Sequence, residues 1–198
     1  MRLITKHVIS EPFKPDKLEL SDLLVIEQIR AGDESAFDTL FTTWYGKLYA
    51  YAFSVLQNEV QAEEVVQTVF CRIWEKRRQW QVHTSMKAYL YGSVYHQCMD
   101  GLRRTKQVQK YQRHVLQNST DGVGTRASDK AELKDLEAKL QYALSQLPHQ
   151  CRAIFQLSRF GGLKYHEIAK QLGISQKTVE AQISKALKHL RDQLSDFL

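Results

Sequence analysis

Side chains able to hydrogen-bond to base edges lie on one side of the segment ISQKTVEAQISKAL, residues 174–187. In the major groove Gln pairs with adenine, Lys with guanine or a phosphate, and a small apolar side chain contacts the thymine methyl group. Gln182, Lys177 and Ala181 fit these three roles. Glu180 either accepts a hydrogen bond from cytosine or pairs with Lys177 or Lys185 within its own helix. The candidate DNA-contacting residues are Ser175, Gln176, Lys177, Thr178, Gln182 and Lys185.

A helix-turn-helix would present these residues, and the surrounding sequence has its pattern. A short apolar face is followed by Gly173, where a tight turn between two helices needs a residue that tolerates positive φ. Ser175 can cap the second helix. The apolar face of the first helix consists of Ile168, Ala169 and Leu172, and the buried face of the second of Val179, Ile183, Leu187 and Leu190. A helical hairpin that binds no ligand remains the alternative.

Apolar residues at helical spacing fill most of the remaining chain. Asp33 is a candidate N-cap for a long helix with an aromatic face over 37–56, and acidic residues precede a second apolar stripe over 65–74. A third helix is expected over 85–111, weakened by Gly92 and Gly101. Helical spacing returns at Leu133, Leu136, Leu140 and Leu144, Pro148 marks a new helix start, and Gly161–Gly162 ends that helix. Polar residues and glycines without apolar periodicity make 118–130 the best linker.

These patterns predict an all-α protein of two small helical domains joined by a flexible linker. The predicted N-terminal domain covers 21–114, the linker 115–132, and the C-terminal domain with the helix-turn-helix 133–198. A chain of 198 residues is long enough for two such domains.

Composition and motifs exclude several classes of protein. No apolar run of membrane-spanning length and no secretory signal core are found, and three scattered cysteines do not indicate a disulfide framework, so a cytoplasmic protein is expected. His166–Glu167 lacks the second histidine of a zinc protease motif, because Lys170 stands in its place. With no phosphate-binding loop, nucleophile elbow or metal cluster, we expect no enzyme, catalytic residue, metal, cofactor or small-molecule substrate.

The net charge of +6 is unevenly distributed. Residues 31–70 hold one Lys or Arg against six Asp or Glu, residues 71–114 hold ten against two, and residues 148–198 hold eight against four. An acidic block beside two basic blocks indicates one protein partner and two contacts with a polyanion, although solvated helix faces alone give the same pattern.

Three blocks in this order resemble the extracytoplasmic-function (ECF) sigma factors of bacterial RNA polymerase, over about 23–194. They are SAFDTLFTTWYGKLYAYAFSVLQNEVQAEEVVQTVFCRIW, MKAYLYGSVYHQCMDGLRR and LPHQCRAIFQLSRFGGLKYHEIAKQLGISQKTVEAQISKAL. The chain departs from the family pattern at Gly101, at Tyr89 in place of a common tryptophan, and at Glu180-Ala181-Gln182 in place of a more basic triplet.

The resemblance implies partners and roles. Core RNA polymerase, through its beta-prime and beta subunits, and promoter DNA would be bound, the helix-turn-helix reading the minus-thirty-five element. An anti-sigma factor, often membrane-anchored in the family, is a further implied partner. The implied polymerase-binding residues are Gln61, Glu63, Glu64, Gln67 and Arg72. The implied minus-ten residues are Trp80, Gln81, His83, Lys87, Tyr89, His96, Arg103 and Arg104. Trp80 and Tyr89 can alternatively be core aromatics.

Two other classes of protein are alternatives to this interpretation. A stand-alone, dimeric helix-turn-helix regulator would bind a palindrome tightly without polymerase, but it leaves the acidic helix and the basic, aromatic segment after it without a role. A nucleic-acid-processing enzyme would need a constellation of carboxylates or metal ligands that the sequence lacks.

Overall fold

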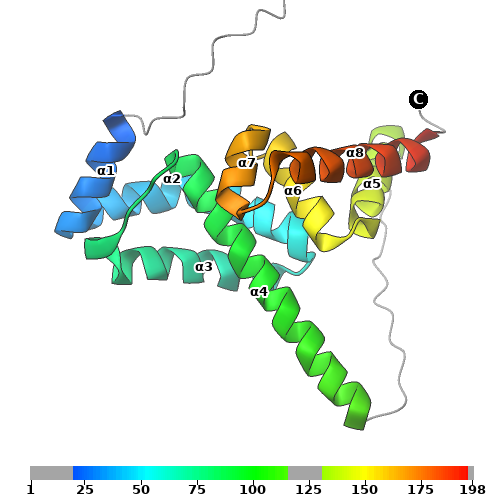
Figure 1. Cartoon of the computed structure of the whole chain (residues 1–198), viewed down its shortest axis with the longest axis horizontal. Coiled ribbons are helices and arrows are strands. Elements are labelled where there is room, and N and C mark those ends of the chain that lie inside the picture. The colour runs from blue at the N-terminus through cyan, green and yellow to red at the C-terminus, as the bar shows by residue number, and fades with distance from the viewer. Residues whose placement is uncertain (1–19, 116–130, 196–198) are drawn as a thin grey trace, which may run out of the picture.

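The computed structural model describes residues 20–115 and 131–195, and these ranges contain helices, turns and loops but no strand (Figure 1). The helices are α1 (Leu20–Ala31), α2 (Glu34–Leu56), α3 (Glu59–Glu75), α4 (Met86–Val115), α5 (Ala131–Gln146), α6 (His149–Arg159), α7 (Tyr165–Leu172) and α8 (Gln176–Gln193). A short 3₁₀ turn, Arg77–Gln79, follows α3. The expected all-helical fold class is confirmed.

Helices α1 to α4 form an N-terminal bundle whose helix ends follow local capping rules. The Asp33 carboxylate accepts hydrogen bonds from the backbone N–H groups of Ser35 and Ala36, so its predicted capping of α2 is confirmed. Gln57 ends α2 with a left-handed φ of 56°, and the Asn58 side chain then caps α3 by accepting from the backbone of Gln61. The two helices are therefore joined by two residues and pack against each other.

The aromatic stripe of α2 packs at the contact with α3. Phe37 lies with its ring centroid 4.9 Å from that of Trp74, and Phe41 at the same distance from Phe70. These α2 rings are half-buried, while the smaller Leu48 and Ala52 on the same helix are fully buried. The predicted aromatic face therefore borders the core, whose centre is aliphatic.

Helices α5 to α8 form the C-terminal group, in which α7 and α8 make the predicted helix-turn-helix. Gly173 between them has φ 65°, and the Ser175 hydroxyl accepts from the backbone N–H of Thr178, as expected. The predicted buried face of α8 needs one correction. Leu187 is 38% exposed and Ala186 is fully buried, because Ala186 is the residue that faces the neighbouring helices.

The two groups pack directly against each other. Helix α6 lies between α2 on one side and α7 and α8 on the other, and α7 packs against the N-terminal half of α4. Seven consecutive residues of α6, Cys151 to Leu157, are buried. The end of α4 projects away from both groups (Figure 1). Helix α4 ends at Val115 and α5 begins at Ala131, so the core of the predicted linker falls outside the described residues, as do the side chains of Leu133 and Leu136.

Candidate nucleic-acid and protein interfaces

The first turns of α8 present the candidate DNA-reading residues. Gln176, Lys177 and Lys185 are exposed, Thr178 and Gln182 are half-buried, and the Ser175 hydroxyl is 2.8 Å from that of Thr178. The opposite face of the helix is held by Val179 and Ile183, which are buried. Because the N-terminal residues of such a helix are those that enter the major groove, this is the geometry of a DNA-reading helix.

Glu180 does not pair with a lysine, which corrects one of the two expectations for it. Its carboxylate accepts a hydrogen bond of 3.0 Å from Nε2 of Gln176, one turn earlier. No ion pair joins Glu180 to Lys177 or Lys185 in the described part of the chain. The bond fixes the orientation of the Gln176 amide and leaves the two lysines available to a polyanion.

A hollow of about 460 Å³ lies between α3, the 3₁₀ turn and the N-terminal half of α4. Its lining includes four of the eight candidate minus-ten residues, Trp80, Gln81, Tyr89 and His96, and one candidate polymerase-binding residue, Arg72. Sequence reasoning missed the other polar residues that line it, which are Lys76, Gln79, Ser93, Gln97 and Asp100. Ser93, Gln97 and Asp100 follow Tyr89 at helical spacing on α4, and that spacing was the signal that could have identified them, whereas Lys76 and Gln79 lie at the end of α3 and in the 3₁₀ turn.

Trp80 forms a buried wall of this hollow. It is 4% exposed, its ring centroid lies 5.9 Å from that of Tyr89, and its indole Nε1 has no hydrogen-bond partner among the described residues. Tyr89 is half-buried and lines the same hollow. The burial of Trp80 agrees with the alternative of a core aromatic, and Tyr89 is the ring with the more accessible face.

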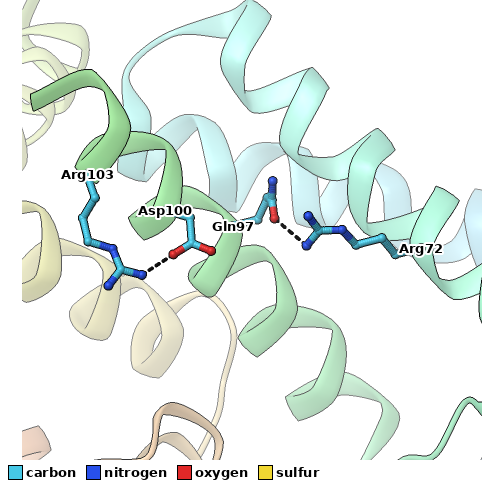
Figure 2. Close-up of polar contacts among 4 residues, drawn as sticks. All are labelled: Arg72, Gln97, Asp100 and Arg103. Carbon is cyan, nitrogen blue, oxygen red and sulfur yellow. Dashed lines mark hydrogen bonds and ion pairs between the residues drawn. The ribbon is translucent and has the colours of Figure 1, made fainter. Parts of the chain in front are cut away.

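Polar contacts along α4 connect it to α3 and order its own surface (Figure 2). Nη1 of Arg72 in α3 donates a hydrogen bond of 2.8 Å to Oε1 of Gln97 in α4. One turn further on, Arg103 pairs with Asp100. Figure 2 shows the two contacts on neighbouring turns of α4. Arg72 therefore contacts the helix that carries the candidate minus-ten residues, besides belonging to the candidate polymerase surface.

The other candidate minus-ten residues lie outside the hollow. His83 is exposed in the loop before α4, and Arg103 and Arg104 are exposed in the second half of that helix. Lys87 is half-buried, and its Nζ lies 3.4 Å from the carbonyl oxygen of Gly162, between α6 and α7. The eight residues therefore divide into four that line the hollow and four that lie outside it, and the second group consists of His83 and the basic residues Lys87, Arg103 and Arg104.

The candidate polymerase-binding residues share the outer face of α3. Gln61, Glu63, Glu64, Gln67 and Arg72 are all exposed. The inner face packs Ala62, Val65, Val66 and Val69 into the core. Nε2 of Gln67 donates to the Glu63 carboxylate at 3.1 Å, and burial with the nearby Glu63 charge raises the pKa of Tyr45 on α2. The result is an acidic, hydrogen-bonded ridge suited to a basic protein surface.

The described residues show neither a metal-binding cluster nor a membrane-spanning helix. No group of three or more His, Cys, Asp or Glu side chains is placed to hold a metal ion within residues 20–115 and 131–195. Over the same ranges, none of the helices combines the length and apolarity that crossing a bilayer demands.

Comparison with known families matches both halves of the chain. Residues 40–108 match the sigma-70 region 2 family, and residues 137–190 match sigma-70, region 4. The first match covers the hollow and the acidic ridge, and the second covers the helix-turn-helix.

Curated relatives and solved structures agree with these matches. The chain is 28% identical to the ECF RNA polymerase sigma factor RpoE of Cereibacter sphaeroides over 164 residues, covering 82% of this chain and 88% of that protein. It is 24% identical to SigW of Bacillus subtilis, covering 86% and 95%. The fold resembles CnrH in complex with the cytosolic domain of CnrY (TM-score 0.65, 22% identity, 90% and 99% covered). It also resembles the sigma factor RpoE in complex with the anti-sigma factor NepR from Bartonella quintana (TM-score 0.62, 21% identity, 82% and 98% covered). The chain belongs to the ECF sigma factors, which direct RNA polymerase in transcription initiation.

Proposed function

We propose that this sigma factor uses three surfaces in the cytoplasm: the acidic ridge of α3 for core polymerase, the hollow and cations of α4 for the minus-ten element, and α8 for the minus-thirty-five element. The hollow is the observation that carries the proposal. It brings together an accessible aromatic ring, three side-chain amides and one imidazole, and the exposed Arg103 and Arg104 follow further along α4. That combination can hold an unstacked base while cations neutralise the backbone.

The energetics of melting favour Tyr89 as the stacking residue. Stacking one base on an aromatic side chain contributes about 1–3 kcal/mol, which is comparable to the cost of unstacking it from the duplex. One or two captured bases therefore shift local melting without ATP. Arg103 and Arg104, on the exposed part of α4, are proposed to bind phosphates.

The primary test is transcription with purified components. The chain is mixed with bacterial core polymerase and a promoter library, and specific start sites are mapped. Initiation from defined sites is expected only when both proteins are present. Tight binding of palindromic duplexes by the chain alone, without specific transcripts, would instead establish the stand-alone regulator.

The role of the hollow is tested by two matched variants. Tyr89→Ala removes the stacking surface and should reduce open-complex formation by about 10- to 100-fold, whereas Tyr89→Phe keeps the ring and should reduce it little. On a template whose minus-ten segment is already mismatched, the defect of Tyr89→Ala should shrink. An equal defect on both templates would show that Tyr89 acts before melting.

The acidic ridge is tested by charge reversal. Glu64→Lys, in the middle of the exposed face of α3, should weaken binding to core polymerase. Glu75→Lys, the same change at the exposed C-terminal end of α3, is the control and should leave binding close to that of the unaltered chain. Equal losses for the two variants would contradict a localised docking surface.

An anti-sigma factor is proposed as a further partner, since both structural relatives described above are bound to a regulatory protein or its cytosolic domain. Co-purification of this chain with the product of a neighbouring gene, and loss of transcription on adding that product, would test it. A membrane-anchored anti-sigma factor would retain this chain in the membrane fraction until its inducing signal arrives.

A further inference from the structure

The start of α8 fixes the backbone from which the side chain of Gln176 extends. The Ser175 hydroxyl accepts from the backbone N–H of Thr178 at 3.1 Å and lies 2.8 Å from the Thr178 hydroxyl. These two hydroxyl groups are therefore partners of each other at the helix end. Gln176 is the first residue of α8, and its side chain is exposed. Of the three residues it has the longest side chain and the most hydrogen-bonding groups to offer to a ligand.

The Glu180 carboxylate holds the Gln176 amide from one turn further along α8. Nε2 of Gln176 donates to Oε1 of Glu180 at 3.0 Å, and both side chains are exposed. Side-chain pairs at this spacing stabilise a helix only slightly, so the main effect of the bond is on orientation. A free glutamine amide can exchange the positions of its oxygen and nitrogen by rotation. Beside Glu180 that rotation would place the amide oxygen against a carboxylate oxygen.

The bond leaves one donor and one acceptor on the Gln176 amide. The amide nitrogen carries two hydrogens, of which Glu180 accepts one, and the amide oxygen is free to accept. In the major groove adenine presents an acceptor, N7, beside a donor, N6–H₂, and a glutamine amide matches both. Cytosine presents a donor alone, guanine two acceptors, and thymine one acceptor and a methyl group. Among the four bases, adenine therefore fits the oriented amide best.

The negative charge of Glu180 acts in two ways at a DNA surface. It repels phosphates, which lowers the affinity of α8 for every sequence alike. It also disfavours base edges that present acceptors, because these would lie beside the carboxylate in the interface without a donor. The first effect reduces affinity and the second increases discrimination. A helix that polymerase brings to the promoter can therefore carry this charge and still select its sequence.

We propose that Glu180 is a positioning residue that orients the Gln176 amide toward an adenine of the upstream promoter element, and that the two residues together set the base preference at that position. The inference rests on the proposed function of α8. A two-bond contact of this kind discriminates by about 5- to 150-fold against a wrong base. The competing mechanism is a direct contact, in which Glu180 itself accepts a hydrogen bond from cytosine.

The first test examines the Gln176–Glu180 bond in the chain alone, without DNA. The side-chain amide resonances of the ¹⁵N-labelled chain are recorded by NMR, and Gln176→Ala identifies those of Gln176 by their loss. Glu180→Ala should shift the Gln176 resonances, because one amide hydrogen loses its acceptor. Asp192→Ala removes an exposed carboxylate at the far end of α8 and should leave them in place. Unchanged Gln176 resonances in both variants would overturn the inference.

The second test measures the base preference with core polymerase. The chain initiates transcription on a library with a randomised upstream element, and the transcribed templates give the preference at each position. The unaltered chain should favour adenine at one position, and Gln176→Ala should abolish that preference. Glu180→Ala should reduce it at least about 5-fold and leave the other positions unchanged. Initiation averaged over the library should not fall, because the variant removes a charge that repels phosphate. Asp192→Ala should keep the full preference.

Two further variants separate a positioning role from the competing mechanisms. Glu180→Gln keeps an acceptor without the charge and should retain most of the adenine preference. The double variant Gln176→Ala, Glu180→Ala should have the same base profile as Gln176→Ala alone, because Glu180 acts through Gln176. If Glu180→Ala instead removed a cytosine preference at another position, Glu180 would be a direct reader and the inference would be wrong. A uniform loss with an unchanged profile would also overturn it, because Glu180 would then only support the helix.

Failure of the proposed function gives a different result. If the unaltered chain initiates at defined sites and Gln176→Ala leaves every base preference intact, the proposed function stands and the inference alone is wrong. If the unaltered chain with core polymerase initiates specifically on no template, the proposed function is wrong, and the assignment of an adenine falls with it. The NMR comparison of Glu180→Ala with Asp192→Ala still decides in that case whether Glu180 orients the Gln176 amide.

Discussion

Arg72 and Gln97 join α3 to α4 by a side-chain hydrogen bond of 2.8 Å, which links the acidic ridge to the helix behind the hollow. Arg72 is exposed and Gln97 is half-buried, so the bond is open to water. The bond therefore contributes little to the free energy of unfolding. Because it connects the two proposed surfaces, docking of a protein on α3 can act directly on α4 through it.

A double-mutant cycle measures this link. Arg72→Ala, Gln97→Ala and the double variant should give a coupling energy of about 0.5 kcal/mol in urea unfolding, because exposed charged pairs and hydrogen bonds contribute little net free energy. Additive effects of the two substitutions would show that the bond is not formed in solution. The same variants in a polymerase-binding assay separate the docking role of Arg72 from its contact with α4, since Gln97→Ala removes only the contact.

Gln182 is expected to read one base pair of the upstream element. Gln182→Ala should relax the preference at that position by about 1–3 kcal/mol and leave the other positions unchanged, because a hydrogen bond to a base edge discriminates only its own base pair. Selection from a randomised upstream element checks this. Gln193→Ala, an exposed glutamine at the far end of α8, is the control. A uniform loss over all sequences would make Gln182 a backbone contact.

The pH dependence of stability should contain a contribution from His149. Burial, and then the nearby Arg152 and Lys106 charges, lower the pKa of His149 below its ordinary value of 6.5, against a smaller opposing effect from the Val55 backbone. The folded chain therefore binds this proton more weakly than the unfolded chain. As the pH falls through 6.5 the unfolded state takes up the proton first, so the free energy of unfolding decreases.

Urea unfolding at pH 7.5 and at pH 5.5 measures this effect. His149→Gln should show a smaller loss of stability between the two values than the unaltered chain does. His83→Gln, which changes an exposed histidine, should show the same loss as the unaltered chain. An identical pH profile for all three chains would contradict the assignment to His149.

The three cysteines should differ sharply in reactivity. Burial raises the pKa of the Cys98 thiol to about 12 and also raises that of Cys151, whereas Cys71 is exposed. Because the thiolate is the reactive form, one thiol of the three should react rapidly with a thiol reagent at pH 8 in the folded chain, and all three in denaturant. Cys71→Ser should abolish the rapid phase. A rapid phase that survived this substitution would show that a buried thiol becomes accessible in solution.

Local sequence signals predicted much of the helix-turn-helix. Asp33, Gly173 and Ser175 were identified because a cap or a tight turn depends on residues within a few positions along the chain. The buried face of α8 was wrong at one position for a geometric reason. At 3.6 residues per turn, Ala186 lies about 20° from Val179 around the helix axis and Leu187 about 80° away, so the smaller residue faces the core.

Contacts between distant segments could not be predicted in the same way. Gly92 looked like a weak point in a helix, and its reason becomes visible only with Gln171 against it. Arg152 carries a charge that sequence patterns assign to the surface, yet it is buried because two helix ends supply carbonyl acceptors from separate parts of the chain. The burial of Trp80 could not be predicted either, because the exposure of a single aromatic side chain depends on which distant segment packs over it.

The position of α6 limits how freely the parts of this factor can be exchanged. Residues Cys151 to Leu157 of α6 are buried between α2 and the helix-turn-helix. Along this stretch α6 therefore packs against both the N-terminal bundle and the C-terminal group. A chimaera that replaces residues 149–195 as a block therefore also replaces the surface on which α2 packs. Replacing only the exposed residues in the first turns of α8 changes the DNA-reading surface and keeps the native packing between the two groups of helices. These residues of α8 are therefore the better target for engineering promoter choice.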